Sequence, residues 1–265
     1  MNSVRAVAIL VLLLSAPMAG AVGPKPLHYE LKLDVPITLA ATAAWVGSEL
    51  AKPRIGPETC RFCEPNALDA AVRNAVVWRE PARARHASDA LVFGVLPAAM
   101  IGHQLLAARG EGDWQAGFVD LLVVAEAAAI AQDLNQLVKF TVARERPFVH
   151  YGDPARPHEA DDDVSFYSGH TTFAFALASS AGMVSTLRGY RSAPWVWGVG
   201  MSLAATAGWL RMGGDMHWFS DVLVGAVVGT AVGAGLPWLL HRDERGSDGP
   251  AVAASPAMVA FSFAF

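Results

Sequence analysis

Six long apolar segments constrain the fold of this chain more than any other feature of its sequence. Each is about 17 to 24 residues long, close to the length with which a helix crosses a bilayer, and strand-like alternation is scarce in them. Breaks that contain Pro and Gly separate them. The sequence therefore predicts an all-α fold, a six-helix bundle embedded in a membrane. The segments are approximately Asp34–Ala51, Ser88–Ala107, Gln115–Val138, Thr171–Leu187, Pro194–Leu210 and Phe219–Leu240.

Polar residues inside these segments leave a second arrangement open. Asp120 and Glu126 lie in the third segment, and His103 and Gln104 lie near the end of the second. Such groups are costly in lipid unless they face the interior of the bundle. Ala-rich helices that carry them also pack as a soluble globule, which is the alternative to membrane embedding.

The composition fits a single large domain with an extensive core. Hydrophobic residues form 53% of the 265-residue chain and charged residues 17%, a lower charged share than soluble domains usually have. The formal net charge is −4 and no long Lys/Arg run is present, which argues against nucleic acid as a partner. We expect no obligate protein partner.

The N-terminus has the pattern of an export signal. Arg5 supplies a positive charge, Ala6–Leu14 form a short apolar core, and Ala19 to Ala21 offer a small-residue cleavage site. Residues 1–21 are therefore predicted to be a signal peptide or an uncleaved anchor. An N-terminal helix and loop are expected over residues 22–87, a catalytic helical core over 88–241 and a tail over 242–265.

Two cysteines, Cys60 and Cys63, form the single Cys-x-x-Cys pair of the chain. One such pair supplies half of a four-ligand zinc site, and no second pair completes it. Exported chains meet oxidising conditions, so a local disulfide is predicted.

The tail ends in an alternating pattern at Val259, Phe261, Phe263 and Phe265. The pattern is typical of a strand, but one strand cannot close a barrel, so a disordered or loosely packed tail is expected.

Three polar clusters lie at the edges of the apolar segments in the second half of the chain. The first contains Lys139, which closes the third segment, and Arg146 before Pro147. A guanidinium fork suits two oxygens of a phosphate, whereas a lysine at a helix C-terminus also stabilises the helix dipole. Arg144 and Glu145 between them are expected to be solvated.

The second cluster is Ser168-Gly169-His170, directly before the fourth segment. Ser168 is a suitable helix N-cap, and the free N–H groups of a helix N-terminus also bind anions. Gly169 would let the backbone approach an anion, and His170 would act beside it as a general acid. The acidic run Asp161–Asp163 upstream could bind a cation, but a solvated loop is expected.

The third cluster combines Arg211, His217 and Asp221. His217 and Asp221 are four residues apart, so on a helix they would share one face and hydrogen-bond. A carboxylate on one imidazole nitrogen leaves the other free as a nucleophile. Arg211 would reach the same anion, and Asp215 is left open between a solvated loop residue and a supporting role.

Together the clusters resemble the three signature motifs of the type 2 phosphatidic acid phosphatase and vanadium haloperoxidase superfamily, here in its phosphatase branch. The motifs are Lys-x₆-Arg-Pro, Pro-Ser-Gly-His and Ser-Arg-x₅-His-x₃-Asp, and the resemblance covers about residues 88 to 241. Two positions depart from them: Tyr167 replaces the motif Pro and Leu210 the motif Ser.

The resemblance implies phosphoryl transfer through a phosphohistidine, without a metal or cofactor. His217 would be the nucleophile, Asp221 would orient it, and His170 would be the general acid. Vanadate would act as a phosphate mimic. The phosphate oxygens would be held by Lys139, Arg146, Ser168, Gly169 and Arg211, including the backbone N–H groups of Ser168 and Gly169.

The substrate expected from this resemblance is a lipid phosphate, of the phosphatidic acid or isoprenoid phosphate type. The alternatives are an exported acid phosphatase of broad specificity, a vanadium-dependent haloperoxidase and a catalytically inert membrane protein. Intact His170, His217 and Asp221 argue against the last of these.

The side of the membrane that the site faces follows from how many segments span. A cleaved signal followed by six spans would put the clusters in the cytoplasm, and omitting the first segment as a span returns them to the periplasm. That second topology places the arginines after the fourth and sixth segments inside, as the positive-inside rule prefers. It also places the seven Lys/Arg residues from Lys52 to Arg85 outside, which counts against it. We expect a membrane-associated enzyme of the cell envelope whose site faces the periplasm or exterior.

Overall fold

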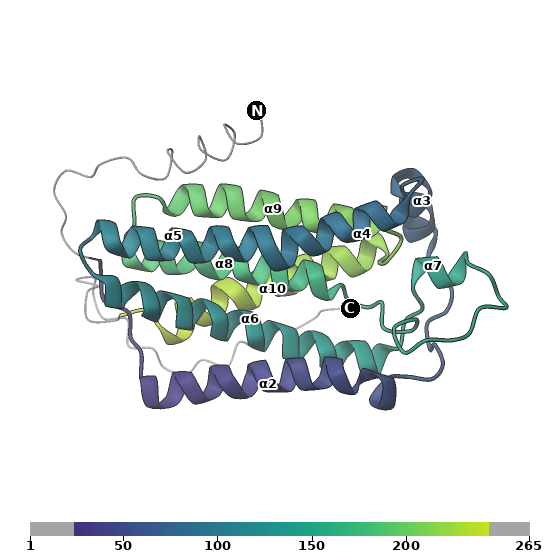
Figure 1. Cartoon of the computed structure of the whole chain (residues 1–265), viewed down its shortest axis with the longest axis horizontal. Helices are drawn as coiled ribbons and strands as arrows, with labels where there is room; N and C mark the ends of the chain where they lie inside the picture. Colours follow the sequence, from purple (N-terminus) through teal and green to yellow (C-terminus); the bar gives the residue numbers. More distant parts are fainter. Residues whose placement is uncertain (1–23, 244–265) are drawn as a thin grey trace, which may run out of the picture.

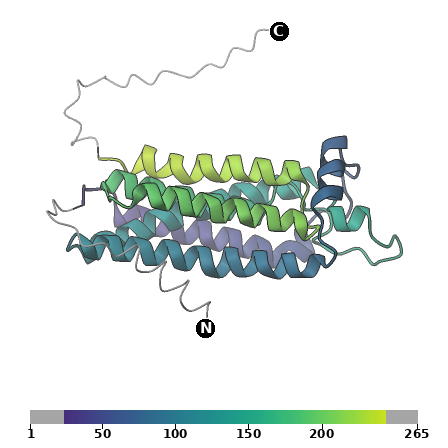
Figure 2. The same cartoon turned by 90° about the horizontal axis from the view of Figure 1, so that it is seen from above.

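Six long helices build the protein, and a computed structural model describes them over residues 24–243 (Figures 1 and 2). The expected signal and the Phe-rich tail lie outside these described residues. The all-α expectation is confirmed. The long helices are α2 (Leu31–Ile55), α6 (Trp114–Val142), α8 (Gly169–Arg188), α9 (Ala193–Gly213), α10 (Phe219–Leu240) and a continuous helix made of α4 (Pro81–Ala90), the π-helical turn η1 (Leu91–Val95) and α5 (Leu96–Gly110).

Each of the six apolar segments forms one of these helices, and most helices extend beyond the apolar run. The second begins at Pro81, where the fixed φ of proline suits a first helical position, and it continues through a charged stretch that the apolar pattern omitted. It therefore crosses the boundary expected at residues 87 and 88. Two short helices, α3 (Ala67–Val76) and α7 (Pro147–His150), were not expected.

Helix α8 lies at the centre of the bundle and packs against α5, α6, α9 and α10. Its contact with α10 is close because three glycines spaced four residues apart line that face of α10. A Cβ atom at Gly229 would lie 2.5 Å from the Thr172 carbonyl oxygen. The glycines Gly225, Gly229 and Gly233 thus set the distance between the two helices that carry the second and third clusters.

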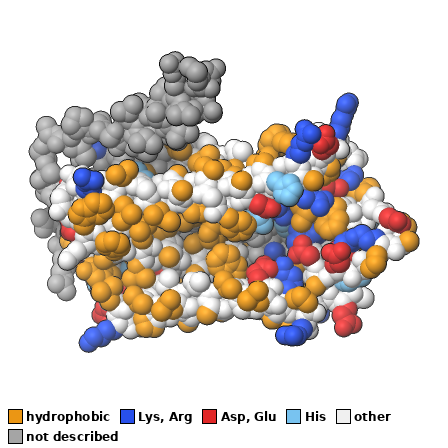
Figure 3. Space-filling view, viewed as in Figure 1, with side chains coloured by type: hydrophobic (Ala, Val, Ile, Leu, Met, Phe, Trp, Pro, Cys, Tyr) orange, Lys and Arg blue, Asp and Glu red, His pale blue; other side chains and the backbone are white. Residues whose placement is uncertain are grey.

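The helices alternate in direction, so all three clusters meet at one end of the bundle. The C-termini of α2, α6 and α9 and the N-termini of α4, α8 and α10 lie there, beside α3 and α7 (Figure 1). Charged side chains gather at this end, whereas hydrophobic side chains cover the flank (Figure 3). At the opposite end Leu27 pairs with Arg242, which joins the two ends of the described chain.

Within residues 24–243, three helices are long and apolar enough to cross a membrane by length and composition. They are Pro81–Gly110, Trp114–Val142 and Phe219–Leu240. Their flanks expose large apolar side chains, among them Phe118 at 64%, Leu137 at 63% and Val227 at 61%. The other three long helices do not reach this measure, so the membrane expectation is supported for half of the bundle.

Candidate active site

A cavity of about 220 Å³ opens at the polar end of the bundle. Six of the eight site residues expected from the sequence line it, although they come from three clusters far apart in the chain. These are Lys139, Arg146, Gly169, His170, Arg211 and His217. The other two, Ser168 and Asp221, are fully buried behind its wall.

The His217 imidazole is held at both of its nitrogens. Nδ1 lies 2.9 Å from the Ser165 carbonyl oxygen, and Nε2 lies 3.1 Å from Arg146 Nη1. A carbonyl oxygen accepts only, so Nδ1 carries the proton and Nε2 offers its lone pair to Arg146. Burial and then the charges of Arg146, Arg211 and Lys139 hold the pKa of His217 well below its ordinary value. The imidazole is therefore neutral, with its lone pair on the cavity side.

Asp221 does not hydrogen-bond His217 directly, in contrast to the expectation from their spacing. Its Oδ2 atom lies 3.7 Å from His217 Nδ1 and instead accepts from Ser165 Oγ at 2.5 Å and Trp218 N at 3.0 Å. A spacing of four brings two side chains together only when one helix contains both residues, whereas α10 begins at Phe219, after His217. Asp221 thus touches the groups that hold His217.

His170 lies in the first turn of α8, outside the three candidate spans. Its Nε2 atom is 2.8 Å from Asp89 Oδ1, and its ring meets Phe93 edge-on at 4.9 Å. Burial lowers the pKa of His170 to about 4, although the hydrogen bond to Asp89 opposes this shift. A phosphate dianion in the cavity would raise this pKa again, because it favours the charged imidazolium.

Asp89 is a functional residue that the sequence reasoning missed. Besides His170, it contacts Arg211, whose Nη1 atom lies 3.3 Å from Asp89 Oδ1. A single acidic residue at the start of an apolar segment carries no recognisable signal. Only the continuation of α4 into η1 brings Asp89 to the cavity.

Three of the cations that line the cavity are almost fully buried. Lys139 is 5% exposed, Arg146 3% and Arg211 4%. Arg211 Nε has no hydrogen-bond partner among the described residues, so this N–H is left for an anion. Buried donors without protein partners are costly in a folded chain unless a ligand uses them.

Ser168 caps α8, which was one of its two expected roles. Its Oγ atom accepts from Thr171 N at 3.4 Å and Thr171 Oγ1 at 2.9 Å. Its backbone N–H donates to the Asp221 carbonyl oxygen at 3.1 Å, so this N–H does not face an anion as expected. Gly169 does line the cavity, where a Cβ atom would lie 3.2 Å from Lys139 Nζ.

The expectation that Asp161–Asp163 form a solvated loop is wrong. Asp162 and Asp163 are buried, and Asp161 reaches the cavity, where its carboxylate oxygens lie 3.0 Å from Lys52 Nζ and 3.1 Å from Arg146 Nη2. Burial raises the pKa of Asp161, but the charges of Arg146, Lys52 and Lys139 outweigh it and hold the pKa well below its ordinary value.

The charges around the cavity suit a doubly charged anion. Four cations line it, and two carboxylates, Glu49 and Asp161, oppose them. With both histidines neutral, the lining residues carry a net charge of +2, of which Asp89 beside Arg211 offsets one until His170 is protonated. A phosphomonoester carries close to two negative charges at neutral pH.

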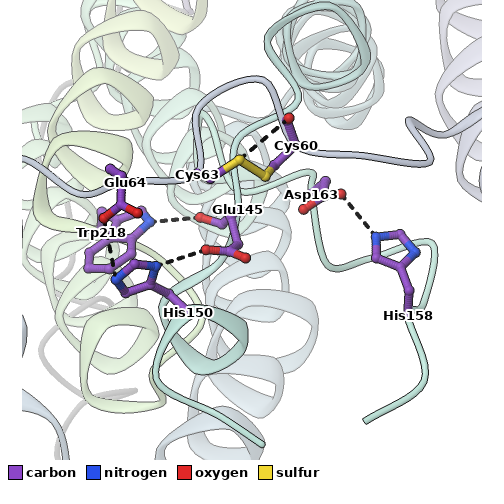
Figure 4. Close-up of a disulfide and its surroundings, with 8 residues drawn as sticks. All are labelled: Cys60, Cys63, Glu64, Glu145, His150, His158, Asp163 and Trp218. Carbon is purple, nitrogen blue, oxygen red and sulfur yellow. Dashed lines mark hydrogen bonds and ion pairs between the residues drawn. A yellow bond between two sulfur atoms is a disulfide. The ribbon is translucent and has the colours of Figure 1, made fainter. Parts of the chain in front are cut away.

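The expected local disulfide is confirmed between Cys60 and Cys63 (Figure 4). Cys60, Glu145 and Asp163 lie close enough to hold a metal, but the Cys60 sulfur is already bonded to Cys63 and supplies no thiolate. The cysteine loop pairs with the chain after α6: Arg61 N donates to the Ala143 carbonyl at 2.8 Å, and Glu145 N donates to the Phe62 carbonyl at 3.1 Å.

Arg144 and Glu145 are not solvated as the sequence suggested. Arg144 is 8% exposed and bonds two buried carboxylates. The Glu145 carboxylate accepts from His150 Nδ1 at 2.9 Å, and its carbonyl accepts from Trp218 Nε1 at 2.8 Å (Figure 4). The residues between Lys139 and Arg146 therefore belong to the interior of this end.

The two departures from the motifs leave the cavity formed. Tyr167 is buried and its carbonyl accepts from Asn135 Nδ2 at 2.7 Å, which fixes the chain before α8 without a proline. Leu210 is buried in α9 at 7% exposure.

Comparison with known proteins adds a curated relative and a solved structure. The lipid A 1-phosphatase of Porphyromonas gingivalis (strain ATCC 33277) is 41% identical over 85 residues, which are 31% of this chain and 18% of the relative. The chain thus matches less than a fifth of that relative's length. The crystal structure of a transmembrane PAP2 type phosphatidylglycerolphosphate phosphatase from Bacillus subtilis superposes with a TM-score of 0.48 and 18% identity, over 77% of this chain and 94% of that one.

A family model covers the part of the chain that holds the three polar clusters. The model described as PAP2 superfamily matches residues 120–245. This range contains all eight expected site residues, from Lys139 to Asp221. Residues 120–245 of this chain are therefore similar to the PAP2 superfamily.

Proposed function

We propose that the protein is a membrane phosphatase that hydrolyses phosphomonoesters or pyrophosphates of lipids through a phosphohistidine. The observation that carries the proposal is the neutral His217 imidazole, whose Nε2 lone pair lies in a cavity lined by buried cations and by His170. A nucleophile, an acid and an anion site are thus combined.

In the first step, His217 Nε2 attacks phosphorus and forms a P–N bond while the bond to the leaving alcohol breaks. The leaving oxygen takes the proton of His170, which is charged when the phosphate dianion is bound. Arg146, which lies on Nε2 before substrate binds, would move to a phosphoryl oxygen. Lys139 and Arg211 stabilise the negative charge of the equatorial oxygens.

In the second step, water attacks phosphorus and breaks the P–N bond. His170 is now neutral and takes a proton from the water, so inorganic phosphate leaves and the imidazole of His217 is restored. The sum is one ester and one water converted to one alcohol and one phosphate. His170 donates the proton that moves in the first step and accepts the proton of water in the second.

An aromatic wall beside the cations supports a lipid as the alcohol. Trp45 from α2, Phe93 from η1 and Phe173 from α8 line the same cavity. Their rings form a row, in which the ring centroid of Phe173 lies 5.4 Å from that of Trp45 and 6.0 Å from that of Phe93. Phe93 is 56% exposed on the apolar flank. An apolar chain leaving the phosphate along this wall would stay out of water. The name of the Porphyromonas gingivalis relative, a lipid A phosphatase, supports the same class.

The disulfide supports an active site that faces the periplasm. Cys60 and Cys63 belong to the same end of the bundle as the cavity, and disulfides persist in oxidising compartments. Several of the basic residues between Lys52 and Arg85 form ion pairs with carboxylates at this end. Their positive charges are therefore compensated and argue less strongly against an external position of this end. Lys52 bonds Glu49 and Asp161, and Arg73 bonds Asp215.

The proposal is tested with His217→Ala in purified, detergent-solubilised protein. We expect phosphate release from a panel of lipid phosphates and soluble esters to fall by more than about a thousandfold, because the nucleophile is lost. A ³²P-labelled substrate quenched in alkali should label the wild-type protein and not this variant.

His158→Ala is the matched control, because His158 is 45% exposed, pairs with Asp163 and does not line the cavity. Its activity should equal that of the wild type. Full activity in folded His217→Ala would refute the mechanism, and a preference for soluble esters over every lipid phosphate would refute the substrate class.

A further inference from the structure

A buried ion-pair network lies behind the cavity and is not used by the proposed reaction. Arg144 Nη1 donates to Asp221 Oδ1 at 2.6 Å, and Arg144 Nη2 donates to Asp69 Oδ2 at 2.7 Å. Both carboxylates are completely buried. One guanidinium therefore pairs with two buried carboxylates, and its fork fits both because it presents several N–H groups in one plane.

Asp69 takes part in this network although it lies outside the region that matches the superfamily model. It lies on α3, the short helix across the end of the bundle, whereas the match begins at residue 120 (Figure 2). Asp69 Oδ1 accepts from Ser220 N at 2.8 Å, and Oδ2 accepts from Ser220 Oγ and Asn66 Nδ2, each at 2.7 Å. These three hydrogen bonds fix the carboxylate in a single orientation.

The network reaches His217 through two short links. Ser165 Oγ donates to Asp221 Oδ2 at 2.5 Å, and the Ser165 carbonyl accepts the Nδ1 proton of His217 at 2.9 Å. Trp218, next in the chain to His217, donates its N–H to the same Asp221 oxygen at 3.0 Å. A shift of Asp221 would therefore move both the acceptor and the backbone that orient the imidazole.

The same network sets the charge that His217 experiences. On the cavity side His217 faces Arg146, Arg211, Lys139 and His170. On the other side lies Asp221, 3.7 Å from Nδ1, whose charge Arg144 compensates. Without Arg144 an uncompensated carboxylate would favour the imidazolium, which has no lone pair to attack phosphorus.

We propose that Asp69 and Arg144 are positioning residues of the hydrolytic site, which hold Asp221 and Ser165 and thereby keep His217 oriented and neutral. This inference rests on the proposed function, because it assigns the network to the same nucleophile. It extends the site to α3, an element that the three sequence motifs do not include.

The test compares Arg144→Gln and Asp69→Asn by pH profiles of kcat/KM with one lipid phosphate substrate. Arg144→Gln removes a cation near His217, so the acidic limb should move up by about one pH unit. Asp69→Asn removes a negative charge from the same ion-pair network, so the acidic limb of the kcat/KM profile of this variant should stay in place or move to lower pH. In both variants kcat should fall at least about tenfold because the alignment is loosened. Ionisation of the substrate is common to all variants and cancels in the comparison.

Two further measurements separate positioning from general loss of structure. The inhibition constant of inorganic phosphate should change less than about threefold, because Lys139, Arg146 and Arg211 remain. Arg144→Lys keeps the charge and should return the acidic limb to its wild-type position while kcat stays reduced. Arg83→Gln, which removes an exposed ion pair with Glu80, is the matched control and should behave as wild type.

Folded Arg144→Gln and Asp69→Asn proteins with wild-type pH limbs and kcat would overturn the inference. Limbs that move in the same direction in both variants would also overturn it. If Arg144→Gln does not fold, the isosteric Asp69→Asn decides alone: kcat must fall with phosphate inhibition preserved. Activity in His217→Ala would instead refute the proposed function itself, so the two failures are distinguishable.

Discussion

Two hydrogen bonds hold the His217 imidazole, and both involve groups other than Asp221. The acceptor at Nδ1 is a neutral carbonyl, and the donor at Nε2 is a guanidinium. A neutral acceptor raises the basicity of an imidazole less than a direct carboxylate does. The arrangement therefore favours a weakly basic nucleophile that stays unprotonated, at the cost of some nucleophilicity.

At this residue scale, Asp89→Asn is expected to change the pH dependence of the reaction. The Asp89 hydrogen bond raises the pKa of His170 against the effect of burial, so its loss lowers that pKa further. His170 acts in its protonated form, and activity is lost as the pH rises through its pKa. The descending alkaline limb of kcat should therefore move to lower pH, with kcat at neutral pH down about tenfold.

Glu80→Gln is the matched control for this variant, because Glu80 is an exposed acid directly before α4 that pairs with the exposed Arg83. Its pH profile should match the wild type. An alkaline limb of Asp89→Asn that coincides with the wild-type limb would show that Asp89 does not support His170.

The residues of the site could be named from the sequence, but not their contacts. Motif spacing identified Lys139, His170 and His217 because these side chains are each followed or preceded by recognisable apolar segments. Asp89 could not be found in this way. Its role comes from a helix turn that approaches α8 in space, and sequence periodicity carries no information about that distance.

At the scale of elements, the apolar periodicity predicted the six long helices and missed α3. Helix α3 is ten residues long, and its buried residue is the polar Asp69. Isolated helices of this length are marginal, so α3 depends on docking. Asn66 caps it at Asp69 N, and Arg73 fixes it by two 2.7 Å hydrogen bonds to Asp215. Asp215, for which the sequence left both a solvated loop position and a supporting role open, therefore contacts Arg73 and supports α3.

The cysteine loop is the second element that holds this end, and a Cys60→Ser/Cys63→Ser variant tests it. A disulfide that closes so short a loop stabilises by about 2 kcal/mol in the chain-entropy model. We expect the variant to unfold at lower temperature in detergent, with lower kcat and similar KM, because the loop supports the chain between Ala143 and Glu145.

Treatment of the wild type with dithiothreitol should reproduce this result, whereas the reductant should leave the double variant unaffected. Equal melting temperatures for the variant and the oxidised wild type would show that backbone pairing holds the loop without the disulfide.

At the scale of the whole molecule, one end carries charge and the flank is apolar (Figure 3). This distribution fits a bundle surrounded by lipid with its polar end at the surface. The opposite end contains Arg188, paired with the buried Asp120 at 2.6 Å, and Arg109. Arginines at that end suit a cytoplasmic surface under the positive-inside rule.

The orientation is tested with single cysteines in intact Gram-negative cells. Tyr151→Cys lies in an exposed position at the site end, and Glu111→Cys lies between α5 and α6 at the other. A membrane-impermeant maleimide should label the first in intact cells and the second only after lysis. Cys60 and Cys63 are joined in a disulfide and should not react.

The inverse labelling pattern would place the site in the cytoplasm. Labelling of both positions in intact cells, or release of the protein by alkaline carbonate without detergent, would contradict membrane embedding.

The sequence by itself determined the class of fold, the positions of six helices and the identity of most groups in the cavity. It could do so because apolar periodicity and short motifs are local properties. The tertiary structure alone decided which of these groups meet: Asp221 contacts Ser165, Asp161 turns inward onto Arg146, and Asp69 reaches Arg144 across 75 positions of the chain. Such contacts depend on which helix ends meet in space, and the physical reason they form is the cost of burying charge without a partner.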